Sequence, residues 1–426
     1  MKSMKLLIIP KPVMNRELAV ESYCFRFIKA DDYFNLHRKG FYDGTIVSPC
    51  IDVLEMVGLE SFTNGLPIFV PITNLTLLTN VEQQFLQPPN KVIFLLNEKT
   101  LPESHYIEHI KKLKKLGYCI ALDNISDYKK MKPIIELCDF IFISCANSDY
   151  TKVLDMLNRE YTHLSYVATD VNDMELFEQI KNDRFNLFEG KFYCVPITKG
   201  NKNIAPVKAN RVQLLNIVRN EDFEIADVVK IVLQDPSLSI SLLKFVNSPY
   251  LGLAQKISTI QHAASMMGQS ELRKWVTTAI SNTLALDKPN EISKLSLMRA
   301  KFAENLAGCF EMGVYAQSLF LMGLFSILDV ALDVPMKEAL KVVTVSDNIY
   351  NALVYKEGSF SKILDFILTY ESANWEEVYK LMILNNLEVE EVFDAYINAV
   401  GWYGTIIAAA NMEDTEIVDN TEIVTG

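Results

Sequence analysis

Short apolar runs alternate with amphipathic helical patterns over the first 196 residues or so. Four of these runs are rich in β-branched and aromatic residues, which is typical of buried strands; they are 91–97, 117–124, 138–145 and 162–170. Helical periodicity fills intervening stretches such as 103–116 and 173–183. Alternation of this kind implies parallel strands joined by crossover helices. Enough units occur to predict a closed TIM-like (βα)8 barrel of about eight strands.

From about residue 208 the strand pattern almost vanishes and helical periodicity dominates. Asp235-Pro236 predicts a helix start, with an N-cap aspartate and a proline in the first turn. The run Asn247-Ser248-Pro249 predicts its end, and Gly313 is expected to close the helix formed by "LMRAKFAENLAGCFEMG". The nearly unbroken apolar stretch 318–332 predicts a helix at the centre of this region.

The composition of the connecting segments predicts four parts of the chain. They are an α/β barrel domain at 1–199, a polar linker at 200–210, an all-α domain at 211–410 and a disordered acidic tail at 411–426. The spare apolar surface of the helical half favours helices docked on the barrel as one fixed unit.

Charge and cysteine content narrow the class of protein. The net charge is −12, which disfavours nucleic-acid binding, and the densest basic run is interleaved with apolar residues as on a solvated helix face; that run is Lys111, Lys112, Lys114 and Lys115. The chain has 7 cysteines and no CxxC, which favours free thiols in a reducing compartment. No apolar run approaches membrane-spanning length, so we expect a cytoplasmic protein without a membrane partner.

Histidines offer two weak metal candidates. His105 and His109 lie four residues apart on a predicted helix, so they could share a face, but no third ligand is visible. His262 is the one histidine of the helical half. Surface positions are expected for His105 and His109, and His262 is expected to be a helix-surface or hydrogen-bonded histidine; no cofactor is predicted.

Two segments carry a family resemblance. "DPSLSISLLKFVNSPYLG" (235–252) and "ISTIQHAASMMGQSELRKW" (257–275) resemble the HDOD domain, as do the later stretches 319–340 and 370–381. The first half resembles the EAL-type cyclic-di-GMP phosphodiesterase barrel. The matching segments are "KPVMNREL" (11–18) for "QPIFDRNL", "LKKLGYCIALDN" (113–124) for the strand ending in two aspartates, and "FNLFEGKFYCVP" (185–196) for "FQGY…KP". The resemblance implies a two-domain bacterial signalling protein.

Departures from the EAL pattern affect the positions that the resemblance assigns to metal binding. Gapless alignment puts the motif glutamate on Cys24 and its arginine on Ile28, whereas a two-residue gap would use Ser22 and Arg26. The remaining vestigial mouth positions are Pro71, Phe94, Asp123, Asn124, Phe142, Ser144 and Thr169. Phe94 and Phe142 are expected to place apolar bulk at the mouth. Because a hard cation needs several oxygen ligands, Asp123 by itself is not a metal site, and loss of hydrolysis is predicted.

The helical half also lacks the metal-binding residues of the related HD hydrolases. In "GLFSILD" (323–329), Ser326 and Ile327 stand where those hydrolases have a His-Asp pair. The favoured interpretation is a non-catalytic adaptor that acts through protein partners of a signalling pathway. Two alternatives stay open, a sensor that binds a cyclic dinucleotide weakly without cleaving it and a residual phosphodiesterase. The partner, the input signal and the oligomeric state are not determined by the sequence.

Overall fold

The computed structural model describes residues 6–29, 49–85, 87–97, 102–123, 125, 127–146, 149–195, 214, 217–218, 220, 222–233, 236–247, 257, 259–284, 290–341 and 345–419. The chain divides into two compact units. The barrel unit is Met1–Val195 together with Leu368–Asp394, and the helical unit is Pro196–Ile367 together with Ala395–Gly426. The segment 368–394 therefore joins the barrel, although its sequence resembles the HDOD half.

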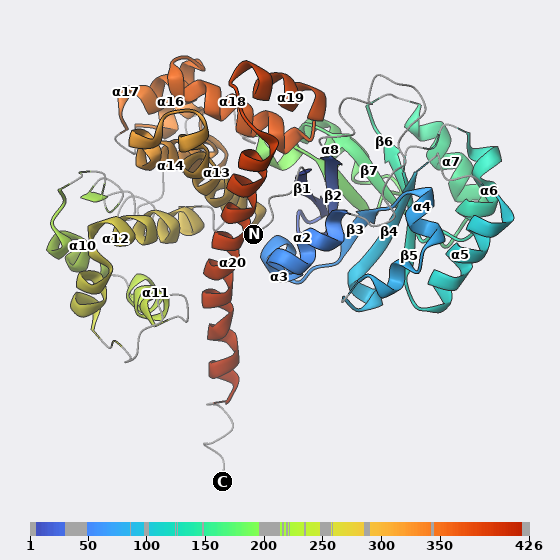
Figure 1. The fold of residues 1–426 in the computed structure, drawn as a ribbon, viewed down its shortest axis with the longest axis horizontal. Coiled ribbons are helices and arrows are strands. Elements are labelled where there is room, and N and C mark those ends of the chain that lie inside the picture. The colour runs from blue at the N-terminus through green and yellow to red at the C-terminus, as the bar shows by residue number, and fades with distance from the viewer. Residues whose placement is uncertain are drawn as a thin grey trace, which may run out of the picture. The chain divides into compact units, whose positions relative to one another are not determined.

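The barrel unit contains a closed eight-stranded barrel in the order β1 to β8 (Figure 1). Its strands are β1 (Leu6–Met14), β2 (Val20–Lys29), β3 (Ile68–Pro71), β4 (Val92–Asn97), β5 (Cys119–Asp123), β6 (Phe140–Ser144), β7 (Ser165–Val171) and β8 (Leu187–Gly190). The helices of this part are α2 (Pro49–Val57), α3 (Leu59–Thr63), α4 (Asn74–Leu78), α5 (Ser104–Lys115), α6 (Tyr128–Ile135), α7 (Tyr150–Glu160) and α8 (Met174–Ile180), with short 3-10 turns at Val81–Gln83, Pro89–Lys91 and Phe192–Cys194. All four strands predicted from the apolar runs are confirmed.

The first strand departs from a regular (βα)8 barrel. β1 runs antiparallel to both β2 and β8, whereas β2 to β8 are mutually parallel. A tight turn causes this, because the Asn15 side chain accepts hydrogen bonds from the backbone N–H groups of Glu17 and Ala19, and Leu18 has a φ of 63°. A two-strand hairpin is necessarily antiparallel.

Side chains fill the barrel interior. The buried interior cluster consists of Val13, Cys24, Phe69, Ile93, Leu95, Ala121, Phe142 and Val167. The Phe69 ring meets the Phe142 ring edge-on, with 5.0 Å between centroids. The interior is therefore a packed core with room for chemistry only above it, at the carboxyl ends of the parallel strands.

The helical unit contains no strand among its described residues, and the predicted fold class, a barrel followed by a helical region, is confirmed. The remaining helices of the chain are α10 (Ile225–Val232), α11 (Pro236–Val246), α12 (Ile260–Leu284), α13 (Asn290–Cys309), α14 (Ala316–Phe325), α15 (Leu328–Leu332), α16 (Met336–Ala339), α17 (Asp347–Tyr350), α18 (Ser359–Ser372), α19 (Trp375–Leu384) and α20 (Val389–Asp419), with a 3-10 turn at Gly313–Tyr315 and a π-helical turn at Asn351–Tyr355. Of these, α19 belongs to the barrel unit, and α18 and α20 each contribute residues to both units. α12 is broken at Gly268, whose φ is 68° and ψ is 175°.

Several predicted helix boundaries can be compared with this arrangement. α11 begins at Pro236 and ends after Val246, as predicted, while Asp235 lies outside the described residues. The single helix predicted over 318–332 is wrong, because Ser326 ends α14 and α15 begins at Leu328; its predicted burial is confirmed. Gly313 does not close α13, which ends at Cys309, followed by Glu311 at a φ of 57°.

At the C-terminus, α20 continues to Asp419, into the segment for which disorder is predicted. Residues 420–426 and the predicted linker 200–210 lie outside the described residues.

Gly323 sets the spacing between α13 and α14. A Cβ atom at Gly323 would lie 2.4 Å from the Arg299 carbonyl oxygen and 2.7 Å from the Ala300 Cα. Both are backbone atoms of α13, so the helices must separate to admit a methyl group. The Ser296 hydroxyl donates to the Leu324 carbonyl at 2.8 Å across the same contact.

We expect Gly323→Ala to lower the free energy of unfolding by about 1–3 kcal/mol, as overpacking does. Gly308→Ala is the matched control, because nothing lies within 4 Å of a Cβ atom there and alanine is the better helix former. It should stabilise by about 0.5–1 kcal/mol. Urea denaturation of both variants checks this, and equal effects of the two changes would contradict the close packing at Gly323.

Candidate functional site at the barrel mouth

The carboxyl ends of the parallel strands meet at one end of the barrel, where EAL-type enzymes carry their metal site according to the resemblance. Strand alternation identifies the side chains that point toward this mouth, because each lies two residues beyond a member of the interior cluster. These positions are Arg26, Pro71, Asn97, Asp123, Ser144 and Thr169. Glu189, near the end of β8, joins them through its contact with Arg26.

Arg26 is the central group of the mouth. One guanidinium nitrogen donates to Asp123 Oδ2 at 2.9 Å, and the other lies 3.0 Å from Glu189 Oε2 and 3.3 Å from Oε1. Asp123 and Glu189 are only 8% and 5% exposed. Lys11 lies at the edge, with its ammonium 3.9 Å from Glu189 Oε1. A guanidinium on β2 therefore bridges two buried carboxylates, one on β5 and one on β8.

Burial and these charges act on the neighbouring groups. Desolvation opposes the charged form of Arg26, but Glu189 and Asp123 hold the pKa of its guanidinium above the ordinary value. Burial lowers the pKa of Lys11, although Glu189 opposes this shift. Burial raises the pKa of the Cys24 thiol, so the position of the motif glutamate in the gapless alignment holds a neutral thiol that is a poor metal ligand.

The opposite side of the mouth is held by hydrogen bonds between neutral and acidic groups. Ser144 and Thr169 are register partners at the ends of β6 and β7. Ser144 Oγ donates to Asp170 Oδ2, and Asp170 takes a left-handed φ of 60°. Asp170 is therefore turned toward β6.

The predicted vestigial positions fall into two groups. Cys24, Pro71, Asp123, Phe142, Ser144 and Thr169 lie in the barrel interior or at its mouth. Phe94 does not, because its ring packs against Phe85 and Tyr118 at 5.6 and 4.9 Å on the outer face of β4. The expectation that Phe94 fills the mouth is wrong, since alternation along β4 turns Ile93, Leu95 and Asn97 inward. Asn124 lies outside the described residues.

The residues at this mouth do not fit the divalent metals of EAL-type hydrolysis. Among the described residues, no group of three or more histidine, cysteine, aspartate and glutamate side chains is arranged to hold a metal ion. The two buried carboxylates, Asp123 and Glu189, already share the guanidinium of Arg26. A dication placed between them would meet a fixed positive charge, so no hydrolytic step can be derived through a metal here.

Ser326 and Ile327, the vestigial HD pair of the helical unit, also lie beside an arginine, Arg299. Ser326 Oγ donates to the Gly323 carbonyl and accepts a hydrogen bond from Arg299 at 3.2 Å. Ile327 is only 3% exposed and packs as an apolar residue. Burial raises the pKa of the nearby Asp329 carboxyl. The position of the HD pair thus holds a hydroxyl and an aliphatic side chain.

The other candidates from the sequence lie on helices. His262 is exposed on α12 and His105 on α5, where its Nδ1 lies 3.5 Å from Glu103, whereas His109 of α5 is half-buried. Two lysines of the basic run on α5 form ion pairs, Lys112 with Glu82 and Lys114 with Asp139. In the part of the chain that the structure describes, no helix is both long enough and apolar enough to cross a membrane.

Comparison with known proteins identifies the domain that follows the barrel. The HDOD domain model matches residues 204–345, so the chain carries an HDOD domain after an eight-stranded barrel. The HDOD domain predicted from its motifs is confirmed by this match, and the barrel predicted before it is confirmed by the strand order.

The chain is similar to the protein YuxH of Bacillus subtilis, with 27% identity over 420 residues that cover 95% of this chain and 100% of YuxH. It is also similar to the cyclic di-GMP phosphodiesterase CdgJ of Vibrio cholerae, with 25% identity over 318 residues and 74% of each chain. Among solved structures, the PaMucR phosphodiesterase in complex with c-di-GMP matches 44% of this chain and 94% of its own, at 17% identity and a TM-score of 0.37.

Sequence reasoning missed Glu189 and the bridge that Arg26 makes. A signal for Glu189 was present, because "FEG" puts a glutamate where the resembled "FQGY" segment has glutamine. The pairing itself was not visible, since Arg26 and Glu189 lie 163 residues apart.

Proposed function

We propose that this protein is a non-catalytic signal-transduction adaptor of the cyclic-di-GMP phosphodiesterase-like class, which acts through contacts with protein partners. The observation that carries the proposal is the bridge of Arg26 to Asp123 and Glu189. In this arrangement a positively charged side chain occupies the space between the buried carboxylates, and a metal-activated water has no place to form.

Two further observations support the proposal. The packed interior below the mouth is intact, with Phe69 against Phe142 and Cys24 between the strands, so the barrel retains its scaffold. CdgJ is described as a cyclic di-GMP phosphodiesterase, which connects the chain to that signalling chemistry. Retained packing with altered polar groups is the pattern expected when a fold serves as a binding scaffold. Cys24, Cys119, Cys138 and Cys145 are free thiols, in keeping with a cytoplasmic location.

The experiment is a turnover and binding assay with purified full-length protein and cyclic-di-GMP in Mg²⁺ or Mn²⁺. We expect no linear dinucleotide above a protein-free control, and weak or no binding by calorimetry, because the donors of Arg26 already engage Asp123 and Glu189. Linear product that scales with protein and disappears in Asp123→Asn would establish the residual phosphodiesterase instead. A tight one-site isotherm without product would establish the sensor.

A further inference from the structure

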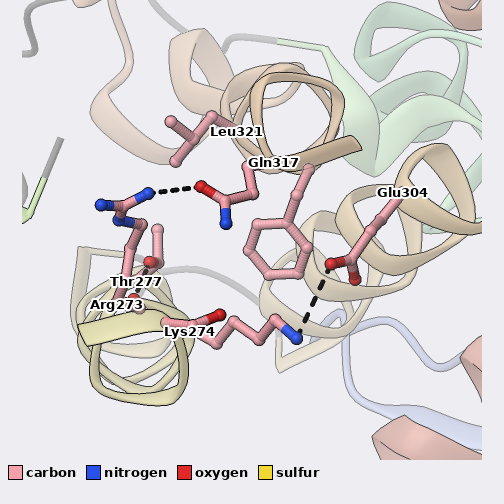
Figure 2. Close-up of a pocket in the computed structure, with 8 residues that line it drawn as sticks. Arg273, Lys274, Thr277, Glu304, Gln317 and Leu321 are labelled. Carbon is pink, nitrogen blue, oxygen red and sulfur yellow. Dashed lines mark hydrogen bonds and ion pairs between the residues drawn. The ribbon is translucent and has the colours of Figure 1, made fainter. Parts of the chain in front are cut away.

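The hollow between α12, α13 and α14 in the helical unit is lined by polar side chains that are already paired (Figure 2). Arg273 donates to Gln317 and to the Asn220 carbonyl, and Lys274 lies 3.7 Å from Glu304. Away from open solvent the hollow has a volume of about 20 Å³, which is room for about one water molecule. Its charged groups therefore hold one another and leave no place for a ligand.

Lys11, at the barrel mouth, has a different environment. It lies on β1 directly opposite Cys24, a member of the interior cluster, so its side chain points into the barrel. Its ammonium lies 3.9 Å from Glu189 Oε1, which is beyond hydrogen-bond distance. Among the residues that the structure describes, Glu189 is its only ion-pair partner, and no acceptor forms a hydrogen bond with it. An inward-facing ammonium with so little compensation is unusual.

The surroundings of Lys11 favour the neutral amine over the ammonium. Burial has the largest effect and lowers the pKa of Lys11; Glu189 opposes this shift, and the positive charges of Arg26 and Lys191 add to it. Cys24 opposes the shift only as a thiolate, and burial keeps its thiol neutral near pH 7. A neutral lysine amine is a nucleophile, and desolvation beside another cation is a usual way to obtain one.

Access and charge define what this amine can react with. Its side chain is 27% exposed, so a small reagent reaches it from solvent. Arg26 is already balanced by Asp123 and Glu189, and once the Lys11 amine is neutral the local charge becomes negative. An anionic reagent is therefore disfavoured. We propose that Lys11 is a nucleophilic amine that captures small uncharged aldehydes as imines at the barrel mouth.

The reaction balances without a further reagent. The lone pair of the neutral Nζ adds to the aldehyde carbon and forms the N–C bond of a carbinolamine. The carbonyl oxygen then leaves as water with both amine hydrogens, and a neutral imine remains. Loss of the ammonium charge does not leave Glu189 unpaired, because Arg26 lies 3.0 Å from its Oε2. Imine formation thus removes a poorly solvated charge and keeps the Arg26 bridge.

Reductive alkylation of the full chain tests the proposal. Propanal with cyanoborohydride converts each imine to a stable secondary amine, and mass spectrometry of peptides gives the labelling rate of each lysine across a pH series. The curve of Lys11 should lie at lower pH than those of the exposed Lys111 and Lys152. Guanidinium chloride should abolish this offset, because unfolding removes the burial. Glyoxylate, an anionic aldehyde, should give a lower ratio of Lys11 to Lys111 labelling than propanal.

The double variant Arg26→Met and Asp123→Asn tests the part played by the neighbouring cation. It removes one positive and one negative charge, so Lys11 and Glu189 remain as a balanced pair. The Lys11 curve of the folded variant should shift to higher pH, while Arg159→Met, at an exposed position on α7, should leave it unchanged. A Lys11 curve that coincides with that of Lys111 in the native chain, an offset that survives unfolding, or no shift in the double variant would each overturn the proposal.

Discussion

Arg26→Met should lower the free energy of unfolding of the barrel unit by about 3–5 kcal/mol, the usual cost of breaking a buried ion pair from one side. The change leaves Asp123 and Glu189 as buried carboxylates without their shared guanidinium, and the Lys11 ammonium, 3.9 Å from Glu189, is too far to replace it. The loss of unfolding free energy is measured by chemical denaturation, and hydrogen exchange of peptides from the barrel strands assigns it to the barrel unit.

If unpaired buried charges cause the loss of stability in Arg26→Met, then removing those charges should restore it. The triple variant Arg26→Met, Asp123→Asn and Glu189→Gln removes all three charges, so it should recover most of the lost stability. Arg159→Met, at an exposed position on α7, should change stability by no more than about 0.5 kcal/mol. If the triple variant is as unstable as Arg26→Met, lost packing rather than an unpaired charge explains the effect.

Tyr370→Phe should cost about 2–5 kcal/mol, because one hydroxyl serves two buried backbone groups of β1. Tyr370 Oη accepts a hydrogen bond from the Ile8 N–H at 3.1 Å and donates to the Ile8 carbonyl at 2.9 Å. Both residues have 0% exposure. β8 pairs with β1 only at Val13 and Met14, so it does not extend along this edge to Ile8. Each buried group left without a partner costs about 1–3 kcal/mol.

The matched control is Tyr106→Phe on α5, a half-buried tyrosine for which a change within about 0.5 kcal/mol is expected. Amide exchange at Ile8 should accelerate in Tyr370→Phe and stay slow in the control.

Burial raises the pKa of Tyr370 above the ordinary value of 10.0. The folded state therefore retains the phenolic proton more tightly than the unfolded chain, so the contribution of Tyr370 is complete below about pH 10 and declines as the pH rises further. An undiminished advantage over Tyr370→Phe at high pH, or no acceleration of exchange at Ile8 in Tyr370→Phe, would contradict this role.

The two bridges have a common architectural consequence. Arg26 and Ile8 both lie on the β1–β2 hairpin, which is the antiparallel departure from the regular barrel. Arg26 ties the hairpin to β5 and β8 at the mouth, and Tyr370 ties it to a segment from near the end of the chain. Restoration of a metal site would therefore require replacing a group that also stabilises the barrel.

Local patterns in the sequence alone predicted several strands, a helix end and most positions of the barrel mouth. Period-two and buried apolar runs predicted β4 to β7, and turn chemistry at Asn247 predicted the end of α11, because backbone propensity and burial act over a few residues. The vestigial mouth positions followed from motif spacing, and most of them lie on inward-facing strand positions.

Tertiary structure decided the rest, for reasons of distance along the chain. Whether Phe94 faces inward depends on the register of β4 in a closed barrel, and it packs outward against Tyr118. The pairing of Arg26 with Glu189 and of Ile8 with Tyr370 joins residues 163 and 362 positions apart. No local pattern encodes such contacts, because they form only when the barrel closes and buried charges and backbone groups must find partners away from water.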